Sequence, residues 1–195
     1  NQNRILAYTN NRVMQYNDHI RTMRGLPKSL TVGEHVINNT AISMGRSGML
    51  SVEDEFQVTQ VSSKTHKVEI DQGTELEILY CTLAGAHNTF SNVPVPTDRE
   101  HFQALIKYYA NQKNWHKYYL LKNTYPDLRP RDAATVHKAQ GSSYDTTFID
   151  LGDLSSCRDK SMAARLLYVA FSRARKRVVL YGQLAPKYGG IITGT

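Results

Sequence analysis

Hydrophobic and polar residues change their period twice along this chain. Residues 4–8 form a short apolar run typical of a buried strand, and this run ends at Thr9 and Asn10. Asn10 or Asn11 can cap the helix that follows, whose apolar residues recur at helical spacing until a stop signal at Gly25. A strand followed directly by a helix predicts the opening of an α/β unit.

From about Thr31 the period changes to two. Leu76, Ile78 and Tyr80 alternate with glutamates, residues 67–70 also alternate, and residues 56–61 alternate imperfectly. The polar links between these runs are too short for parallel crossovers, so they favour hairpins. We therefore predict a small antiparallel meander or barrel over residues 36–83.

Residues 85–96 lack a clear period and are predicted to be a loop. A capping box at Thr97-Asp98-Arg99-Glu100 then predicts a helix, which continues into an aromatic helical stretch closed by Pro126 and Pro130. The antiparallel module and these helices together are predicted to fill residues 31–130.

The α/β pattern returns after Arg131. We predict strands over 133–136, 147–150 and 177–181, a turn at Gln140-Gly141, and a helix over 160–175. The side of this helix that we expect to be buried carries Met162, Ala163, Leu166, Leu167, Val169 and Ala170. Residues 1–30 and 131–195 are therefore predicted to form one discontinuous α/β unit with a parallel sheet.

Composition narrows the class of partner. The chain has 195 residues and a net charge of +7, which favours a polyanion such as nucleic acid; the alternative is a generally basic surface without a specific partner. Cys81 and Cys157 make no disulfide framework, no Cys/His cluster has zinc spacing, and we expect no metal site of that kind.

No apolar run approaches the ~18 residues of a membrane helix. Because Asn1 leads straight into a strand, we expect a fragment of a longer protein.

A polar stretch follows the strand predicted at 133–136. It reads Thr-Val-His-Lys-Ala-Gln-Gly from Thr135 to Gly141. Hydroxyl, imidazole and amide groups at the carboxyl end of a parallel strand suit ligand contact, and a glycine lets the backbone approach a ligand closely. The alternative is an ordinary polar loop with a turn glycine.

Basic side chains gather near the end of the helix predicted over 160–175. The sequence there reads Leu-Tyr-Val-Ala-Phe-Ser-Arg-Ala-Arg, and we expect Arg173 to lie one turn before the helix ends. A guanidinium can meet a phosphate through two N–H groups and stays charged at any working pH. The alternative is that Arg173 and the basic residues at 175–177 only complement the negative end of the helix dipole.

The two stretches resemble motif V and motif VI of superfamily-one DNA helicases, in the right order and at a fitting spacing. The first has the form typical of the RecD/Dda branch, and the second is shared with the wider UvrD-like group. The aromatic stretch with Tyr108, Trp115 and Tyr118 is closer to the Dda side of this branch than to the cellular RecD proteins. The resemblance implies a RecA-like C-terminal domain of the P-loop NTPase type, with an SH3-like barrel inserted before motif V.

The same resemblance implies an ATP-dependent DNA helicase or translocase that moves 5′ to 3′ in the cytoplasm of a bacterial or phage-infected cell. Its cofactor would be ATP with Mg²⁺, and its partner single-stranded DNA. The sequence contains no G-x-x-x-x-G-K-[ST], so the phosphate cradle and the magnesium ligands are expected on an N-terminal RecA-like domain upstream of Asn1. We expect the chain alone to be inactive.

Residue roles carry over position by position. Arg173 corresponds to the catalytic arginine that reaches the ATP γ-phosphate, and Gln140 and Gly141 lie where motif V meets the nucleotide. Many members have a glutamate at the Ser143 position that holds the nucleotide sugar, so recognition of the sugar is not implied here. Asp150 follows an apolar strand as in a Walker B motif, but without a P-loop we interpret it as a structural strand end.

The DNA-contacting positions of the family correspond to Thr135 and His137, and more weakly to Thr9 and Asn10. A core histidine bonded to a backbone carbonyl is the alternative for His137. Three other functions stay open: a superfamily-one RNA helicase, a non-catalytic nucleic-acid-binding module built on the barrel, and a plain α/β domain.

Overall fold

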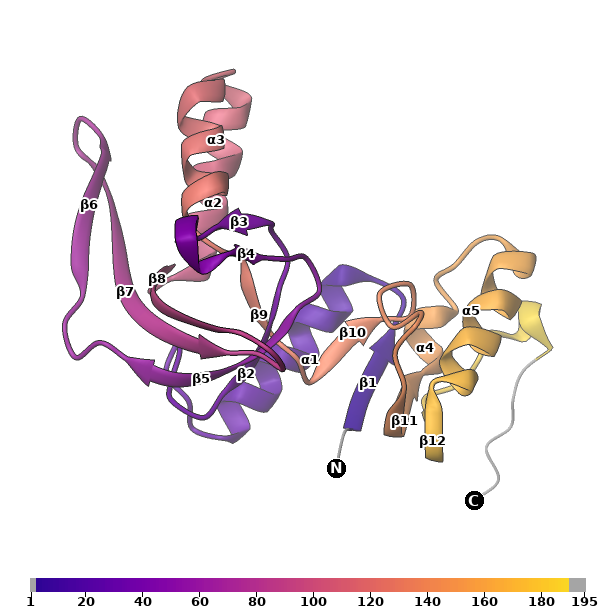
Figure 1. Cartoon of the computed structure of the whole chain (residues 1–195). Helices are drawn as coiled ribbons and strands as arrows, with labels where there is room; N and C mark the ends of the chain where they lie inside the picture. Colours follow the sequence, from indigo (N-terminus) through magenta and orange to yellow (C-terminus); the bar gives the residue numbers. More distant parts are fainter. Residues whose placement is uncertain (1–2, 190–195) are drawn as a thin grey trace. The chain divides into compact units, whose positions relative to one another are not determined.

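The computed structural model describes residues 3–189, and the chain divides into two compact units (Figure 1). The first unit contains residues 1–25 and 131–195, and the second contains residues 26–130. Together they make a mixed α/β protein with one parallel sheet and one curled antiparallel sheet, as the sequence predicts.

The first unit is a four-stranded parallel sheet with helices. The sheet has the order β10-β1-β11-β12, and every neighbouring pair is parallel. Its elements are β1 (Asn3–Ala7), α1 (Asn10–Met23), β10 (Ala133–Thr135), β11 (Tyr144–Asp150), α4 (Leu151–Leu154), α5 (Lys160–Ser172), β12 (Ala174–Tyr181) and a short 3-10 turn at Pro186–Tyr188.

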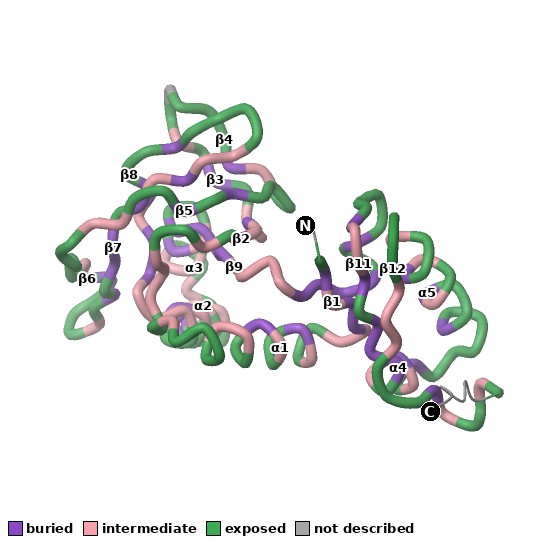
Figure 2. The backbone as a smooth tube through the Cα atoms, turned by 90° about the horizontal axis from the view of Figure 1, so that it is seen from below, coloured by how far each residue is buried: buried purple, intermediate pink, exposed green. Residues whose placement is uncertain are grey.

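Two clusters of buried side chains hold this unit together. Leu6 and Ile149 from the central strands pack with Ala163, Leu166 and Ala170 of α5. In a second, separate cluster, Val13 of α1 packs against Ala7 and Ala133. Figure 2 shows β1 and β11 mostly buried, whereas β12 has only exposed and intermediate residues, as expected for a strand at the sheet edge.

The second unit is built on antiparallel strands. Its main sheet has the order β6-β7-β5-β2-β9, with β8 paired to β7. The elements are β2 (His35–Asn38), β3 (Ile42–Ser43), a 3-10 turn at Gly45–Ser47, β4 (Met49–Leu50), β5 (Glu55–Val61), β6 (His66–Asp71), β7 (Thr74–Ala84), β8 (Thr89–Pro96), α2 (Arg99–Asn111), α3 (Trp115–Thr124) and β9 (Leu128–Pro130).

This unit has two cores. One lies inside the curled sheet around Phe56, Leu83 and Phe90. The other lies between the β6–β7 hairpin and the helices, where Ile78 packs with Phe102, Leu121 and their neighbours. Figure 1 shows α2 and α3 side by side along this hairpin. The alternation in β6 and β7 thus buries its apolar face under the two helices.

The predicted loop at 85–96 is wrong over its last eight residues, because Thr89–Pro96 forms strand β8. Val93 and Val95 are buried, with 0% and 4% of their surface exposed. Pro94 and Pro96 obscured this alternation in the sequence. Both prolines are tolerated because β8 pairs with one strand only, so its other side needs no N–H donors.

The helix predicted over 160–175 is also wrong at its end. It stops at Ser172, Arg173 is its C-cap, and Ala174 already begins β12, so Arg173 does not lie one turn inside the helix. The cause is the sheet: Ala174 pairs with Tyr144 of β11. Within the helix, Ala163, Leu166 and Ala170 are buried as predicted, but Met162 is exposed.

Two helix caps differ from the predicted ones. Thr9, not Asn10 or Asn11, caps α1 by accepting a hydrogen bond from the backbone N–H of Arg12. Asp98, not Thr97, caps α2 by accepting one from His101. Hydroxyl and carboxylate groups both serve as caps, so a sequence with several candidates in a row leaves the position open by one residue.

The chain leaves the parallel sheet after α1 and returns to it just before β10. Arg24 at the end of α1 donates to both carboxylate oxygens of Asp132, at 3.0 and 2.7 Å. The exit and the return of the inserted unit are therefore adjacent, as expected for a chain that avoids crossings on one sheet edge.

Candidate nucleotide and nucleic-acid interface

The carboxyl edge of the parallel sheet gathers the residues predicted to contact DNA. Because β1 and β10 run side by side with Ala7 opposite Thr135, the residues that follow each strand emerge together. Asn10 is exposed after β1, and His137 is exposed after β10. The His137 ring lies 6.1 Å from the ring of Tyr8. The exposure of His137 argues against the alternative of a core histidine.

Thr9 lies at this edge, but its hydroxyl is fully engaged within the protein. The hydroxyl donates to Oδ1 of Asp153 at 2.8 Å and accepts from the Arg12 N–H at 3.2 Å. The other oxygen of Asp153 accepts the backbone N–H groups of Tyr8 and Thr9, both at 2.7 Å. This carboxylate fixes the turn between β1 and α1, which sets where Asn10 is presented.

Thr135 is also turned inward. Only 6% of its surface is exposed, and its hydroxyl accepts the backbone N–H of Lys138 at 3.3 Å. Its carbonyl accepts the N–H of Ala139 at 3.0 Å. Thr135 thus shapes the turn that carries His137.

Asp150 ends β11 as a buried carboxylate with three donors around it. Oδ2 accepts from Nε of Arg12 at 2.8 Å and from the hydroxyl of Tyr16 at 2.6 Å, and Oδ1 accepts the N–H of Asp153 at 3.0 Å. Burial alone would raise the pKa of Asp150, but these hydrogen bonds and the Arg12 charge lower it below its usual value. Burial and the same carboxylate raise the pKa of Tyr16 to about 12.

This network joins α1, α4 and β11 at the strand ends, in keeping with the interpretation of Asp150 as a structural strand end. Sequence reasoning missed Asp153 and its partners. The available signal was the spacing Asp150-Leu-Gly-Asp153 directly after a strand, which is typical of a helix N-cap.

Residues 136–143 link the two edges of the sheet. Strand β10 ends at the carboxyl edge and the parallel strand β11 starts at the amino edge, so this segment has to run the length of the sheet. Val136 and Ala139 anchor it in the core with none of their surface exposed. Gln140 is exposed, and Gly141 has a φ of +92°, which favours glycine.

Arg173 lies at the amino edge, between the end of α5 and the start of β12. Its guanidinium donates to the carbonyl of Ser142 at 3.2 Å and to the hydroxyl of Ser172 at 2.9 Å, and its Nε to the carbonyl of Val169 at 3.3 Å. Its own carbonyl accepts the N–H of Tyr144 at 2.8 Å. Within residues 3–189 these acceptors of Arg173 are neutral, so no carboxylate offsets its charge.

The structure thus separates the predicted site residues into two groups. Arg173 contacts the loop that carries Gln140 and Gly141, at the start of β11. Asn10 and His137 lie at the other edge of the sheet, beside the network on Asp150 at the end of β11. The contact between Arg173 and Ser142 brings the two sequence motifs together, which their distance in the sequence did not show.

No group of three or more His, Cys, Asp or Glu side chains that could hold a metal ion occurs among the described residues. In the same part of the chain, every helix is too short or too polar to cross a membrane. Cys81 and Cys157 are both free and buried, and burial raises the pKa of the Cys81 thiol to about 12.

Comparison with known proteins gives one family match. Residues 132–181 match the UvrD-like helicase C-terminal domain. This range contains both motifs and the whole of β11, α5 and β12. No curated protein matches the chain.

Solved structures of Pif1 helicases resemble the chain at low identity. A Bacteroides Pif1 helicase solved with ADP-AlF3 and ssDNA is 16% identical over 92% of this chain and 40% of that one, with a TM-score of 0.48. A Candida albicans Pif1 helicase is 11% identical over 93% of this chain and 45% of that one, with a TM-score of 0.45. The chain therefore spans less than half the length of either structure.

The family match covers the same residues as the two motifs. Residues 132–181 of this chain are similar to the C-terminal domain of UvrD-like helicases.

Proposed function

We propose that this chain is the second RecA-like half of an ATP-driven single-stranded DNA translocase or helicase of the RecD/Dda branch. The observation that carries the proposal is the contact of Arg173 with the carbonyl of Ser142, because it joins motif VI to the motif V loop. In this proposal the discontinuous first unit is the RecA-like domain, and residues 26–130 form the SH3-like insert with its helices.

Arg173 is the proposed catalytic residue. Its guanidinium is half-buried, and because it is held only by neutral acceptors, its charge is available to an anionic ligand. Next to a transferring phosphoryl group it would stabilise charge that develops on the oxygens, an effect of about 10³-fold or more in related systems. Mg²⁺, when bound with ATP, would neutralise further phosphate charge.

Gln140 and Gly141 are the proposed nucleotide contacts next to Arg173. Gln140 is exposed, and the positive φ of Gly141 leaves its backbone open to close approach. Both lie in the loop whose Ser142 carbonyl accepts from Arg173.

His137 and Asn10 are the proposed DNA contacts, with Thr135 and Thr9 shaping the turns that present them. The first unit also carries most of the positive charge, which suits a phosphate backbone. Closure of the full protein around ATP would shift the balance between two DNA-gripping states, and 5′-to-3′ movement is the direction that branch membership implies.

The proposal requires both DNA binding and an incomplete ATP site. The purified chain should bind oligo(dT) with an affinity that falls with salt, and it should not hydrolyse ATP, since it lacks a P-loop. DNA-stimulated ATP turnover by this chain alone would contradict the proposed division of the site.

A superfamily-one RNA helicase is the second candidate, although the Lys138-Ala139-Gln140-Gly141 form of the first motif argues against it. Side-by-side binding of DNA and RNA oligonucleotides of equal sequence separates the two: a clear preference for RNA would favour the second candidate. A non-catalytic binding module would bind either strand, and Arg173→Ala would leave a full-length ATPase unchanged.

A further inference from the structure

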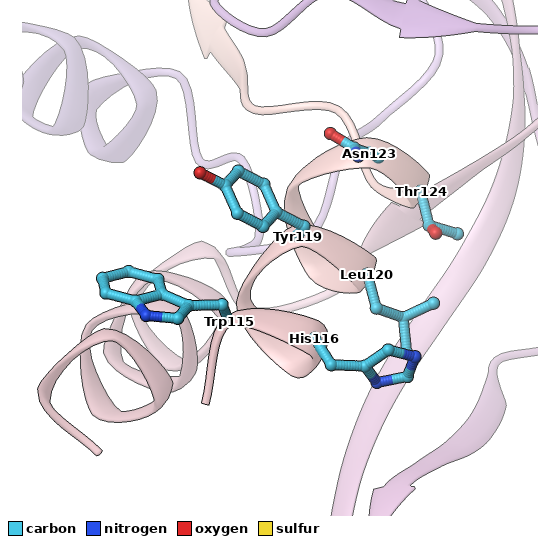
Figure 3. Close-up of a pocket in the computed structure, with 6 residues that line it drawn as sticks. All are labelled: Trp115, His116, Tyr119, Leu120, Asn123 and Thr124. Carbon is cyan, nitrogen blue, oxygen red and sulfur yellow. The ribbon is translucent and has the colours of Figure 1, made fainter. Parts of the chain in front are cut away.

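An exposed aromatic face lies on α3, away from both groups of predicted site residues. Trp115 and Tyr119 are 53% and 55% exposed although they are large and partly apolar. Together with His116, Leu120, Asn123 and Thr124 they line a shallow hollow on the outside of the helix (Figure 3). We refer to these six residues as the aromatic face.

Helix geometry explains why this face is free. Leu121 points into the core between α3 and the β6–β7 hairpin, with none of its surface exposed. At about 100° per residue, five residues of the aromatic face lie on the half of α3 turned away from Leu121, and Thr124 lies at its margin. In Figure 3, Trp115 and Tyr119, one turn apart, project to the same side of the helix.

The rings of this region are ordered by one another. Trp115 meets Tyr118 edge to face at 5.7 Å, and Tyr118 meets Tyr119 at 5.0 Å. The ammonium of Lys122 donates to the Tyr118 hydroxyl at 3.2 Å and lies 5.2 Å from the centre of its ring. Tyr118 is thereby fixed from two sides, and it supports the two exposed rings.

The stretch of sequence around the aromatic face carries positive charge only, although the β6–β7 hairpin on the other side of α2 and α3 carries Glu69, Asp71, Glu75 and Glu77. Residues 101–126 contain four lysines and no aspartate or glutamate, although the second unit as a whole has slightly more acidic than basic residues. Lys107 and Lys113 are exposed. Lys117 donates to the carbonyl of Ile70 and lies on the side of α3 near Leu121, so it is not among the lysines beside the aromatic face. The complement to such a surface is an anion with flat apolar groups.

We propose that the aromatic face of α3 is a second binding surface for single-stranded nucleic acid, on which bases stack against Trp115 and Tyr119 while the neighbouring lysines hold the phosphates. Aromatic rings accept any base, so binding here would be tolerant of sequence. The inference rests on the proposed function for the identity of the partner, but it concerns a different unit of the chain from Arg173 and His137.

The sequence offers a direct probe, since Trp115 is the only tryptophan of the chain. Titrating the purified chain with oligo(dT), while following tryptophan emission and the anisotropy of a label on the DNA, measures local and total binding together. We expect the emission to be quenched along the same saturation curve as the anisotropy, because a stacked base lies against this indole.

Substitutions then test the stacking itself. Trp115→Ala combined with Tyr119→Ala should weaken oligo(dT) binding about tenfold, whereas Trp115→Phe with Tyr119→Phe should keep most of the affinity. Val52→Ala is the matched control, because Val52 is also an exposed apolar residue of the same unit, at 50%. The Phe pair keeps the test valid if the Ala pair unfolds.

Three outcomes would overturn the inference. In the first, the anisotropy shows DNA binding, but the tryptophan emission does not change and the Ala pair binds as tightly as wild type. This result would support the proposed function and exclude this surface. Emission that changes with protein concentration in the absence of DNA would show a second copy of the chain on this face. A chain that binds no oligo(dT) at all would overturn both proposals.

Discussion

The two units of this chain differ most in their charge. The first unit holds 14 lysine and arginine residues against six aspartate and glutamate, whereas the second holds 10 against 11. The excess positive charge that marks the whole sequence therefore belongs to the parallel sheet. In the second unit, the longest stretch with lysines and no acidic residue is the one around α3, residues 101–126.

The units also differ in how buried charge is used. In the first, Asp150 and Asp153 fix the turns at the strand ends that present exposed polar residues. In the second, Asp127 binds Arg99 at 2.9 Å and Arg129 at 2.7 Å, which ties the start of α2 to β9. In both units these carboxylates hold neighbouring elements together, but only in the first unit do they lie beside the proposed site residues.

The largest expected effect tests the chemical half of this comparison. In the full-length protein, Arg173→Ala should lower kcat for DNA-stimulated ATP hydrolysis about 10³-fold, because the guanidinium acts on charge that grows in the transition state. DNA affinity should stay near wild type. Arg173→Lys should recover only part of the rate, since a point charge cannot replace the planar fork.

Arg175→Ala is the matched control for Arg173, being an exposed arginine two residues further on. A loss of rate in Arg175→Ala as large as that in Arg173→Ala would show that the whole basic cluster, rather than one arginine, is responsible.

The second effect tests the structural half. Asp127→Asn should destabilise the second unit by about 3 kcal/mol, because it leaves two arginines next to a buried neutral side chain. Thermal unfolding of the purified chain measures this loss. The matched variant Asp132→Asn, which breaks the more exposed pair with Arg24, should cost less than about 1 kcal/mol.

The stability of the second unit should also depend on pH through the carboxylate of Asp127. Burial opposes its charge, but Arg99 and Arg129 lower the pKa of Asp127 below its usual value. The stabilisation is therefore complete above about pH 4, where the unfolded chain is already ionised, and it is lost as pH falls through the lower folded pKa. In Asp127→Asn, the free energy of unfolding should fall less steeply as the pH is lowered through this range. An unchanged pH dependence would show that other groups cause the loss of stability in acid.

A smaller effect is expected at the carboxyl edge. His137→Ala should weaken oligo(dT) binding a few-fold and leave the slope of log affinity against log salt nearly unchanged, because a neutral imidazole releases few counterions. As His137 is exposed, the melting temperature without DNA should not change. A clear drop in stability would instead assign His137 a structural role against Tyr8.

The smallest effect concerns single charges in the two units. Arg177→Gln on the exposed edge strand β12 should reduce the salt slope of DNA binding by about 0.7, the value for one phosphate contact on a single strand. Lys28→Gln in the second unit should leave the slope unchanged, because Lys28 lies 3.9 Å from Glu100 and is already offset. Equal salt slopes for the two variants would show that positive charge in the two units contributes equally to DNA binding.

The sequence predicted much of both units because hydrophobic period and turn length are local properties. The parallel and antiparallel parts, the α/β opening and the hairpins at 55–84 follow directly from it. The strand at Thr89–Pro96 did not, because Pro94 and Pro96 are acceptable only on an edge strand, and edge position depends on the whole sheet. For the same reason, the pairing of Ala174 with Tyr144 ended α5 earlier than its sequence indicated.

The candidate site was predictable in its residue types but not in its geometry. Gln140, Gly141 and Arg173 were singled out from two separate motifs, yet only the folded chain brings Arg173 to the carbonyl of Ser142. Thr9 and Thr135 are predicted DNA contacts because they correspond to DNA-contacting positions of the family. Whether such a hydroxyl faces solvent or serves a turn depends on neighbours such as Asp153, which are far away in the sequence.

The pairing of Arg24 with Asp132 has a consequence for how such a protein can evolve and be engineered. Because the chain departs and comes back at one point, residues 26–130 occupy the position of a single surface loop in the parallel sheet. A gene segment placed at such a point adds little loop-closure entropy if its own ends lie close together. This junction is therefore where modules could be exchanged between relatives. A short linker from Gly25 to Arg131 would likewise replace residues 26–130 and leave the parallel sheet intact.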